Sequence, residues 1–172
     1  ELAKYLITGQ KTAGILTAIK QFPGYSGITF KPEENLAELE EIHEISQFKK
    51  AMESNPEMIM TANVIYKNID STIPLTFSPE GIIFLKTNLG QTSLIISDDL
   101  SQNSLLKGYS LKEIVSKPLE AGADLMIFSG YRLPVEQGIN EFLRAYLAGE
   151  ISKEKIKRAV SRIIQLKENL SK

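Results

Sequence analysis

The sequence predicts an α/β fold in which parallel strands alternate with helices. Four short apolar segments, at residues 15–19, 58–64, 94–96 and 125–128, have the length and composition of strands buried on both faces. Helical sequence follows each segment, and no hairpin turn separates any two of them. Repeated strand–helix units require parallel strands with helices packed outside the sheet. From this pattern alone, a small doubly wound sheet and one half of an eight-stranded barrel fit equally well.

The composition is that of one globular domain. The chain has 172 residues, of which 42% are apolar and 24% are charged, enough for one core of ordinary size. With 20 basic and 21 acidic residues, no general affinity for nucleic acid is expected. The absence of cysteine excludes disulfides and thiolate chemistry. No apolar run approaches the roughly 20 residues of a membrane-spanning helix, so we expect no such segment.

The first third of the chain predicts two helices around the first strand. Apolar spacing predicts a helix over residues 1–10, and Pro23 and Gly24 end the structure that follows the first strand. Residues 25–35 read as a loop. An acidic helix is then predicted from near Glu34 to about Met52, because apolar residues recur every three or four positions. These apolar residues are Leu36, Leu39, Ile42, Ile45 and Phe48.

The second half carries clear helix boundaries. Ser78 precedes a helix with proline in its first turn, and Ser110 with Glu113 forms a capping box for a later one. Pro118 is expected to bend or end that later helix early. Two helices close the chain, at residues 135–148 and 152–169, with Ser152 as the cap of the second.

The stretch at residues 94–100 is the most informative for function. Three aliphatic residues run directly into Asp98 and Asp99, so a carboxylate stands where a buried strand leaves the core. In parallel α/β folds, active sites lie at the carboxyl ends of the strands. Asp98 is therefore a candidate nucleophile or acid/base group.

Five short motifs, taken together and in order, resemble the bacterial β-N-acetylglucosaminidases of glycoside hydrolase family 3. They are Lys-Gln-Phe-Pro-Gly at 20–24, Met-Thr-Ala-Asn-Val at 60–64, Ile-Ile-Ser-Asp-Asp-Leu at 95–100, Ala-Gly-Ala-Asp at 121–124 and Gly-Glu-Ile-Ser at 149–152. Each motif alone is weak evidence for the family, but the five motifs in this order are specific. The resemblance runs from about Ala13 to the C-terminus.

The resemblance implies that residues 1–172 are the second half of a (β/α)8 TIM barrel, strands five to eight. A half barrel leaves two sheet edges and one face of its core open. We therefore expect an N-terminal half-barrel in the same or a partner chain, with self-pairing of two copies as the alternative.

The resemblance also assigns roles to individual residues. Family members are retaining enzymes, and their nucleophile is the aspartate that follows the Ser or Thr ending strand seven, which is Asp98 here. Asp99 matches the family pattern as a residue that orients the loop in the substrate site. Lys20 matches a lysine that binds sugar hydroxyls, and the alternative is a lysine that snorkels from the strand edge. We expect Arg132, after the last strand, to face the cleft.

The chain departs from the family at its proton-transfer positions. Gln21 and Asn63 stand where the family has histidine, so they keep hydrogen bonding and lose proton transfer. The family loop carries His-Gly-Asp-Thr and then Asp-Ser-His, whose last Asp and His form the acid/base pair. Here that loop reads Tyr-Ser-Gly-Ile at 25–28 and then Lys-Pro-Glu at 31–33. Glu33 or Glu34 is the available acid/base group, and the alternative is that both simply begin the acidic helix.

The remaining polar and aromatic residues point to ordinary roles. His43, the only histidine, lies among glutamates and is expected at the surface. Tyr5, Tyr66 and Tyr131 are either sugar-stacking or packing residues. No metal-ligand cluster or glycine-rich phosphate loop is evident, so neither a metal nor an organic cofactor is expected.

Two functions follow as hypotheses. The first is a retaining β-N-acetylhexosaminidase-like hydrolase that acts on glycans containing N-acetylglucosamine, derived from cell wall or chitin. The second is a catalytically inactive carbohydrate-binding or scaffold protein on the same fold. Asp98 favours the first, and the missing acid/base pair favours the second.

Overall fold

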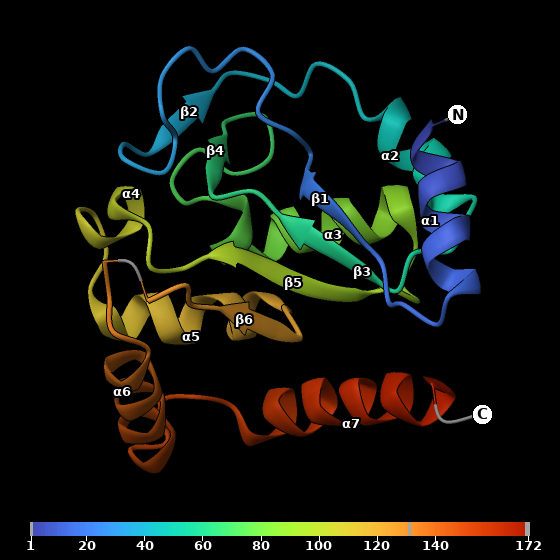
Figure 1. Ribbon diagram of the computed structural model, residues 1–172. Coiled ribbons are helices and arrows are strands. Elements are labelled where there is room, and N and C mark those ends of the chain that lie inside the picture. Colours follow the sequence, from blue (N-terminus) through green and yellow to red (C-terminus); the bar gives the residue numbers. More distant parts are fainter. Residues whose placement is uncertain (1, 131, 171–172) are drawn as a thin grey trace.

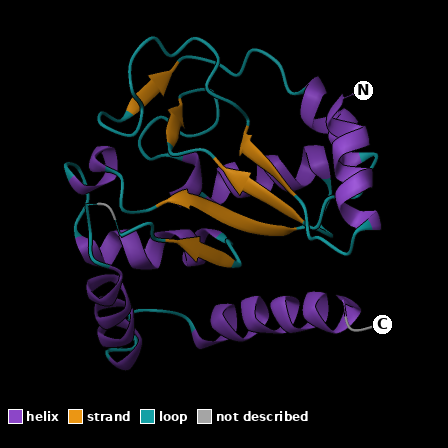
Figure 2. Ribbon diagram, viewed as in Figure 1, coloured by secondary structure: helices purple, strands orange, loops and turns teal. Residues whose placement is uncertain are grey.

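A four-stranded parallel sheet forms the centre of the molecule. The computed structural model describes residues 2–130 and 132–170. Its strands, in spatial order, are β1 (Ala18–Phe22), β3 (Met58–Thr61), β5 (Leu94–Asp99) and β6 (Leu125–Ile127). Every neighbouring pair is parallel, and helices lie behind the sheet and beside it, while no helix within the described residues crosses the face turned to the viewer (Figures 1 and 2). The predicted α/β fold with four parallel strands is confirmed. The bounds of two strands were wrong: β1 begins at Ala18 and not at residue 15, and the segment predicted as one strand at 58–64 leaves this sheet after Thr61.

A second, smaller sheet lies beyond the carboxyl ends of β1 and β3 (Figure 1). It consists of β2 (Ala37–Leu39) and β4 (Val64–Tyr66), which pair in parallel. The predicted acidic helix from 34 to 52 is therefore wrong in its first part, and only α2 (Ser46–Met52) is helical. Ala37 and Leu39 instead pack on an apolar cluster with residues of β4, and this pairing between distant segments overrides the local three-to-four spacing.

The remaining helices begin where their caps predict. Ser78 accepts a hydrogen bond from the Gly81 N–H at the start of α3 (Pro79–Leu89). Ser110 and Glu113 form the expected capping box of α5 (Leu111–Ala121). The Ser152 hydroxyl accepts from the Lys155 N–H at the start of α7 (Lys153–Leu170). The other helices are α1 (Leu2–Thr12), the 3-10 turn Leu75–Phe77, α4 (Asn103–Leu106) and α6 (Val135–Leu147).

Helix α5 runs through Pro118 to Ala121, so the expected early end is wrong. Proline removes one backbone donor, which would pair with the carbonyl of Ile114 in a regular helix. Pro118 is buried, and its own carbonyl accepts from the N–H groups of Gly122 and Ala123 at 3.0 and 2.9 Å. Burial of the ring and these closing hydrogen bonds offset the missing bond in the last turns of the helix.

The main core lies between the sheet and helices α2 and α3. Phe22 is fully buried there and contacts Phe48 and Phe84, with ring centroids 5.2 and 5.9 Å apart. A third cluster, with Phe77, Leu100, Leu105 and Ile114 as its buried members, packs below the end of β5. Packing in these two clusters therefore fixes Phe22, the last residue of β1, and Leu100, which follows β5.

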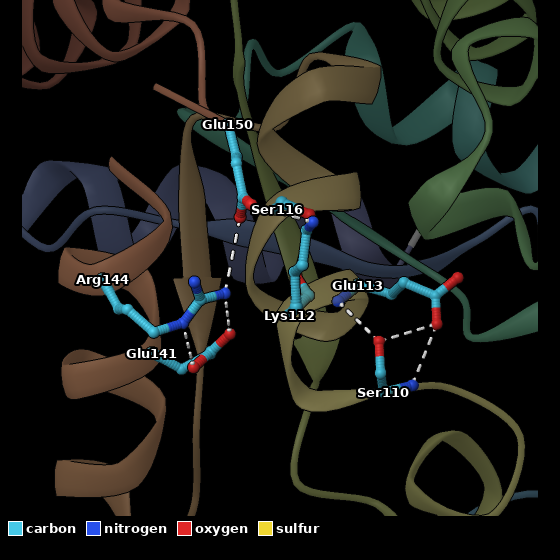
Figure 3. Close-up of polar contacts among 7 residues, drawn as sticks. All are labelled: Ser110, Lys112, Glu113, Ser116, Glu141, Arg144 and Glu150. Carbon is cyan, nitrogen blue, oxygen red and sulfur yellow. Dashed lines mark hydrogen bonds and ion pairs between the residues drawn. The ribbon is translucent and has the colours of Figure 1, made fainter. Parts of the chain in front are cut away.

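Helix α6 is tied to the segment around α5 by polar contacts (Figure 3). Arg144 donates to both carboxylate oxygens of Glu141, at 2.9 and 2.7 Å, and reaches Glu150 at 3.4 Å. Lys112 of α5 lies 3.2 Å from the other oxygen of Glu150. These side chains remain partly exposed, so each ion pair is expected to contribute little to the stability of the fold.

The sheet is open at β1 and β6, its two outer strands within the described residues. Helices α1 and α6 carry rows of exposed aliphatic side chains. On α6 the row repeats every four residues along one face. It comprises Val135, Ile139, Leu143 and Leu147, with exposures of 41, 54, 51 and 82%. As for membranes, no helix within 2–130 and 132–170 has the length and apolarity of a bilayer span.

Candidate active site

Asp98, the penultimate residue of β5, accepts three hydrogen bonds although only 5% of its surface is exposed. Its Oδ1 accepts from the Asp99 N–H at 2.8 Å. Its Oδ2 accepts from Gln21 Nε2 at 2.6 Å and from the Tyr25 hydroxyl at 2.5 Å. The carboxylate is therefore held in one orientation by donors from the ends of β1 and β5 and from the loop after β1.

Tyr25 is the site residue whose role the sequence did not reveal. The pKa of Tyr25 lies far above its ordinary value. Burial of the hydroxyl is the main cause, and the adjacent negative charge of Asp98 adds to it. The hydroxyl therefore stays protonated and acts as a donor to Asp98. The Tyr66 hydroxyl donates to the Gly24 carbonyl at 2.5 Å and so fixes the chain just before Tyr25. The one available signal was that Tyr25 stands where the family has histidine.

Asp99 ties together the loops that follow β5 and β6. Its carboxylate accepts from the N–H and hydroxyl of Ser101, at 2.9 and 2.7 Å, and from those of Ser129, at 3.0 and 2.6 Å. Burial alone raises the pKa of Asp99, but the hydrogen bonds from Ser129 and Ser101 outweigh it and hold the pKa below its ordinary value. This geometry suits the expected role in orienting the loop.

A cavity of about 480 Å³ opens beside Asp98. Gln21, Tyr25 and Asp99 form one side of it, and residues of the loop after β1 and of the segments after β5 and β6 form the rest. These further residues are Pro32, Glu33, Glu34, Ser101, Gln102, Asn103, Ser129 and Arg132. Two carboxylates from the loop therefore face the space next to the candidate nucleophile.

Residues 32–34 form a turn and not the first turn of a helix, so the interpretation of Glu33 and Glu34 as helix-starting acids is wrong. Glu34 accepts a hydrogen bond from Asn103 Nδ2 at 2.8 Å and lies 3.4 Å from Arg132 Nη2. The hydrogen bond from Asn103, followed by the charge of Arg132, holds the pKa of Glu34 below its ordinary value despite some desolvation. Glu34 thus serves as an anchor, and Glu33 is the exposed carboxyl group at this cavity.

Lys20 lies in a different cavity from Glu33. Its peptide bond to Gln21 is cis, and its exposed side chain lines a space of about 300 Å³ together with Glu41, His43 and Glu44. Tyr25 lines both cavities. The structure thus does not bring Lys20 and Glu33 to one continuous surface, and a sugar contact by Lys20 stays a prediction.

Asn63 is a buried residue that hydrogen-bonds to the end of β5 and to the segment after it. It is 1% exposed, and its Nδ2 donates to the Asp99 carbonyl at 3.0 Å and to Gln102 Oε1 at 3.2 Å. Asn63 lines neither cavity. A substrate in either cavity could contact Asn63 only if the residues that cover it moved. Arg132, by contrast, lines the larger cavity, where its contact with substrate stays a prediction.

The tyrosines considered for sugar stacking differ in position. Tyr66 is 2% exposed and packs in the cluster around β4, whereas Tyr5 of α1 is 70% exposed. Tyr131 lies outside the described residues. In the described part of the chain, no group of three or more His, Cys, Asp or Glu is placed to hold a metal ion.

Comparison with known proteins identifies the family. The model of the glycosyl hydrolase family 3 N-terminal domain matches residues 1–166. A β-hexosaminidase of Methylococcus capsulatus is 31% identical over 134 residues, which are 73% of this chain and 39% of that protein. The structure of a family 3 β-N-acetylglucosaminidase from Paenibacillus sp. FPU-7 is 26% identical, with a TM-score of 0.88 over 98% of this chain and 34% of that one.

A third relative agrees. The β-N-acetylglucosaminidase of Thermotoga maritima is 27% identical, with a TM-score of 0.76 over 92% of this chain and 36% of that one. The chain thus spans less than half the length of these relatives. The family resemblance predicted from the five motifs is confirmed. The chain belongs to glycosyl hydrolase family 3, as part or all of the family's N-terminal domain.

Proposed function

We propose that this chain carries the catalytic carboxylate of a retaining glycoside hydrolase that cleaves terminal β-N-acetylglucosaminides, with Asp98 as the nucleophile. The main support is the position of Asp98 at the carboxyl end of β5, oriented by three donors beside a cavity that a second carboxyl group lines. The names of the relatives support the substrate class. The activity belongs to the whole protein, of which the site described here forms one part.

The proposed reaction has two steps. Asp98 attacks the anomeric carbon and forms a C–O ester bond, while the glycosidic C–O bond breaks and its oxygen takes a proton from the acid/base group. Water then attacks the same carbon, gives its proton to that group, and the ester electrons return to Asp98. Two inversions leave the β configuration unchanged.

Glu33 is the proposed acid/base group. It lines the cavity beside Asp98, and its side chain is exposed. Glu34 already accepts a hydrogen bond from Asn103 and forms an ion pair with Arg132. Both interactions favour the ionised form of Glu34 and make it a poor proton donor. One carboxyl group suffices for general acid catalysis in most retaining glycosidases.

The stereochemistry tests the proposal directly. The full-length protein should release 4-nitrophenol from 4-nitrophenyl N-acetyl-β-D-glucosaminide, and proton NMR should show the β anomer of N-acetylglucosamine first. Formation of the α anomer, or no turnover of this activated substrate, would overturn the proposed mechanism.

Replacing Glu33 by glutamine should slow cleavage of N,N′-diacetylchitobiose about 10²-fold, because its sugar leaving group needs a proton. Both substrates are compared by kcat/KM, which reports the first step, because the second step needs Glu33 as a base with either substrate. The kcat/KM of the 4-nitrophenyl substrate should change far less, because nitrophenolate leaves without protonation. Steady-state kinetics on the two substrates measure the difference. Glu136→Gln, on the exposed side of α6, is the matched control and should affect neither. An equal loss on both substrates would exclude Glu33 as the acid.

A carbohydrate-binding protein without catalysis is the second candidate. It is favoured by the low exposure of Asp98, by the hydroxyl that caps it, and by the absence of the family's Asp-His pair. Calorimetric binding of N-acetylglucosamine oligosaccharides without release of nitrophenol would support this second function over the first.

We also propose that the chain needs an N-terminal half-barrel, which would make residues 1–172 the C-terminal half of the barrel domain. The two open sheet edges and the exposed rows on α1 and α6 support this proposal. Coverage of only 39% of the Methylococcus protein supports it as well.

The isolated segment of 172 residues should therefore self-associate or aggregate, and co-expression with the N-terminal half should return it to a defined species. Size-exclusion chromatography with light scattering measures both states. Replacing Leu143 and Leu147 by aspartate should weaken association with that half, whereas replacing the outward-facing Lys157 of α7 by aspartate should not. A compact, soluble monomer of the segment alone would contradict the proposal.

A further inference from the structure

Tyr25 covers the candidate nucleophile. Asp98 stands at the end of a strand beside two cavities, yet it lines neither of them. Gln21 and Tyr25 both donate to Oδ2, and the Asp99 N–H occupies Oδ1. The Asp98 carboxylate is thus 5% exposed and reaches neither cavity while the Tyr25 hydroxyl donates to Oδ2.

Tyr25 also lines both of the cavities described above. One cavity holds Glu33 and Arg132, and the other holds Lys20. Because Tyr25 lines both, displacement of this single side chain would join the two spaces above Asp98. The joined space would bring a cationic side chain, the covered carboxylate and an exposed carboxyl group to one surface.

Tyr25 lies in a loop that follows β1 and that is not part of either sheet. Gly24 has a φ of +115°, in the region that favours glycine, and its carbonyl is held by the Tyr66 hydroxyl. Gly27 has a φ of +89°, and residues 25–35 contain no helix or strand. Rotation of Tyr25 therefore requires no break in the sheet.

We propose that Tyr25 is the gate of Asp98, and that an N-acetylglucosaminide ligand displaces its hydroxyl from Oδ2 and thereby joins the two cavities. This inference rests on the proposed function for its ligand, but the covering of Asp98 by Tyr25 is testable without any catalysis.

The first experiment measures how accessible the Asp98 carboxyl group is. The full-length protein is treated with a water-soluble carbodiimide and glycine ethyl ester, and the modified carboxyl groups are mapped by peptide mass spectrometry. Asp124 is the internal reference, because it is similarly buried, at 8% exposure, and is held by Arg162 far along the sheet from Tyr25. Tyr25→Ala should raise modification of Asp98 about 10-fold relative to Asp124. Tyr25→Phe, which keeps the ring, should raise it less.

The second experiment measures the reaction itself. The rate of covalent labelling of Asp98 by 5-fluoro-N-acetylglucosaminyl fluoride should rise severalfold in Tyr25→Ala, and Tyr146→Phe on α6 serves as the unaffected control. A rise in both experiments supports the gate. Raised carbodiimide modification with no glycosyl labelling in any variant supports the covering by Tyr25 and overturns the proposed function.

Two results would overturn the gate. One is unchanged carbodiimide modification of Asp98 when Tyr25 is replaced. The other is a slower glycosyl labelling in Tyr25→Phe and Tyr25→Ala, which would make Tyr25 a residue that positions the nucleophile in the productive state. If modification of Asp124 also rises in Tyr25→Ala, that variant is unfolded, and Tyr25→Phe alone decides between these outcomes.

Discussion

Replacing Asp98 by alanine should lower kcat/KM for 4-nitrophenyl N-acetyl-β-D-glucosaminide by on the order of 10⁴-fold or more, because the reaction loses its nucleophile. The loss should be larger than for Glu33→Gln on the same substrate. Nitrophenolate leaves without help from an acid, but no other group in the protein can take the place of the nucleophile. Steady-state release of nitrophenol by the full-length protein measures the loss.

A structural cause must be separated from a chemical one, because Asp98 accepts three hydrogen bonds. Sodium azide should restore part of the activity of Asp98→Ala, since a small anion can enter the space left by the carboxylate and attack the anomeric carbon from the same side. The product should then be the α-glycosyl azide. A variant that retains more than about a tenth of the wild-type rate without azide would exclude Asp98 as the nucleophile.

Replacing Phe22 by alanine should lower the free energy of unfolding by about 3–5 kcal/mol, the range for deletion of a buried aromatic ring. Phe22 is fully buried and contacts both Phe48 of α2 and Phe84 of α3. Little relaxation is expected to fill the cavity, because the sheet on one side and two helices on the other fix its walls. Equilibrium unfolding in urea measures the change.

Phe30→Ala is the matched control, because the ring of Phe30 is 49% exposed in the loop after β1. Its effect should stay within about 0.5 kcal/mol, as for most surface substitutions. Phe22 also lies next to Gln21, so its loss should reduce activity through the position of the Asp98 hydrogen-bond donor. Equal destabilisation by the two substitutions would contradict the assignment of Phe22 to the main core.

The sequence predicted the parts of this fold that local patterns determine. The buried part of β5 begins as a continuous apolar run, and the caps at Ser78, Ser110 and Ser152 depend on residues within three positions of each other. The segment before α2 failed because its structure depends on pairing with β4, which is separated from β2 by more than twenty residues of chain. No local spacing carries that information.

The candidate site divides in the same way. Asp98 could be singled out because the end of a buried strand is visible in the sequence. Its contacts with Gln21 and Tyr25 join positions 77 and 73 residues apart, and only the folded chain reveals them. The division between the cavities of Lys20 and Glu33 likewise depends on the position of one tyrosine ring.

Mass spectrometry of the intact full-length protein after incubation with 5-fluoro-N-acetylglucosaminyl fluoride tests the central claim most directly. We expect a mass increase of one fluorinated glycosyl unit, located on Asp98 by peptide mapping and absent from Asp98→Ala. An adduct on any other residue, or no adduct while the sugar still binds by calorimetry, would contradict the assignment of Asp98 as the nucleophile.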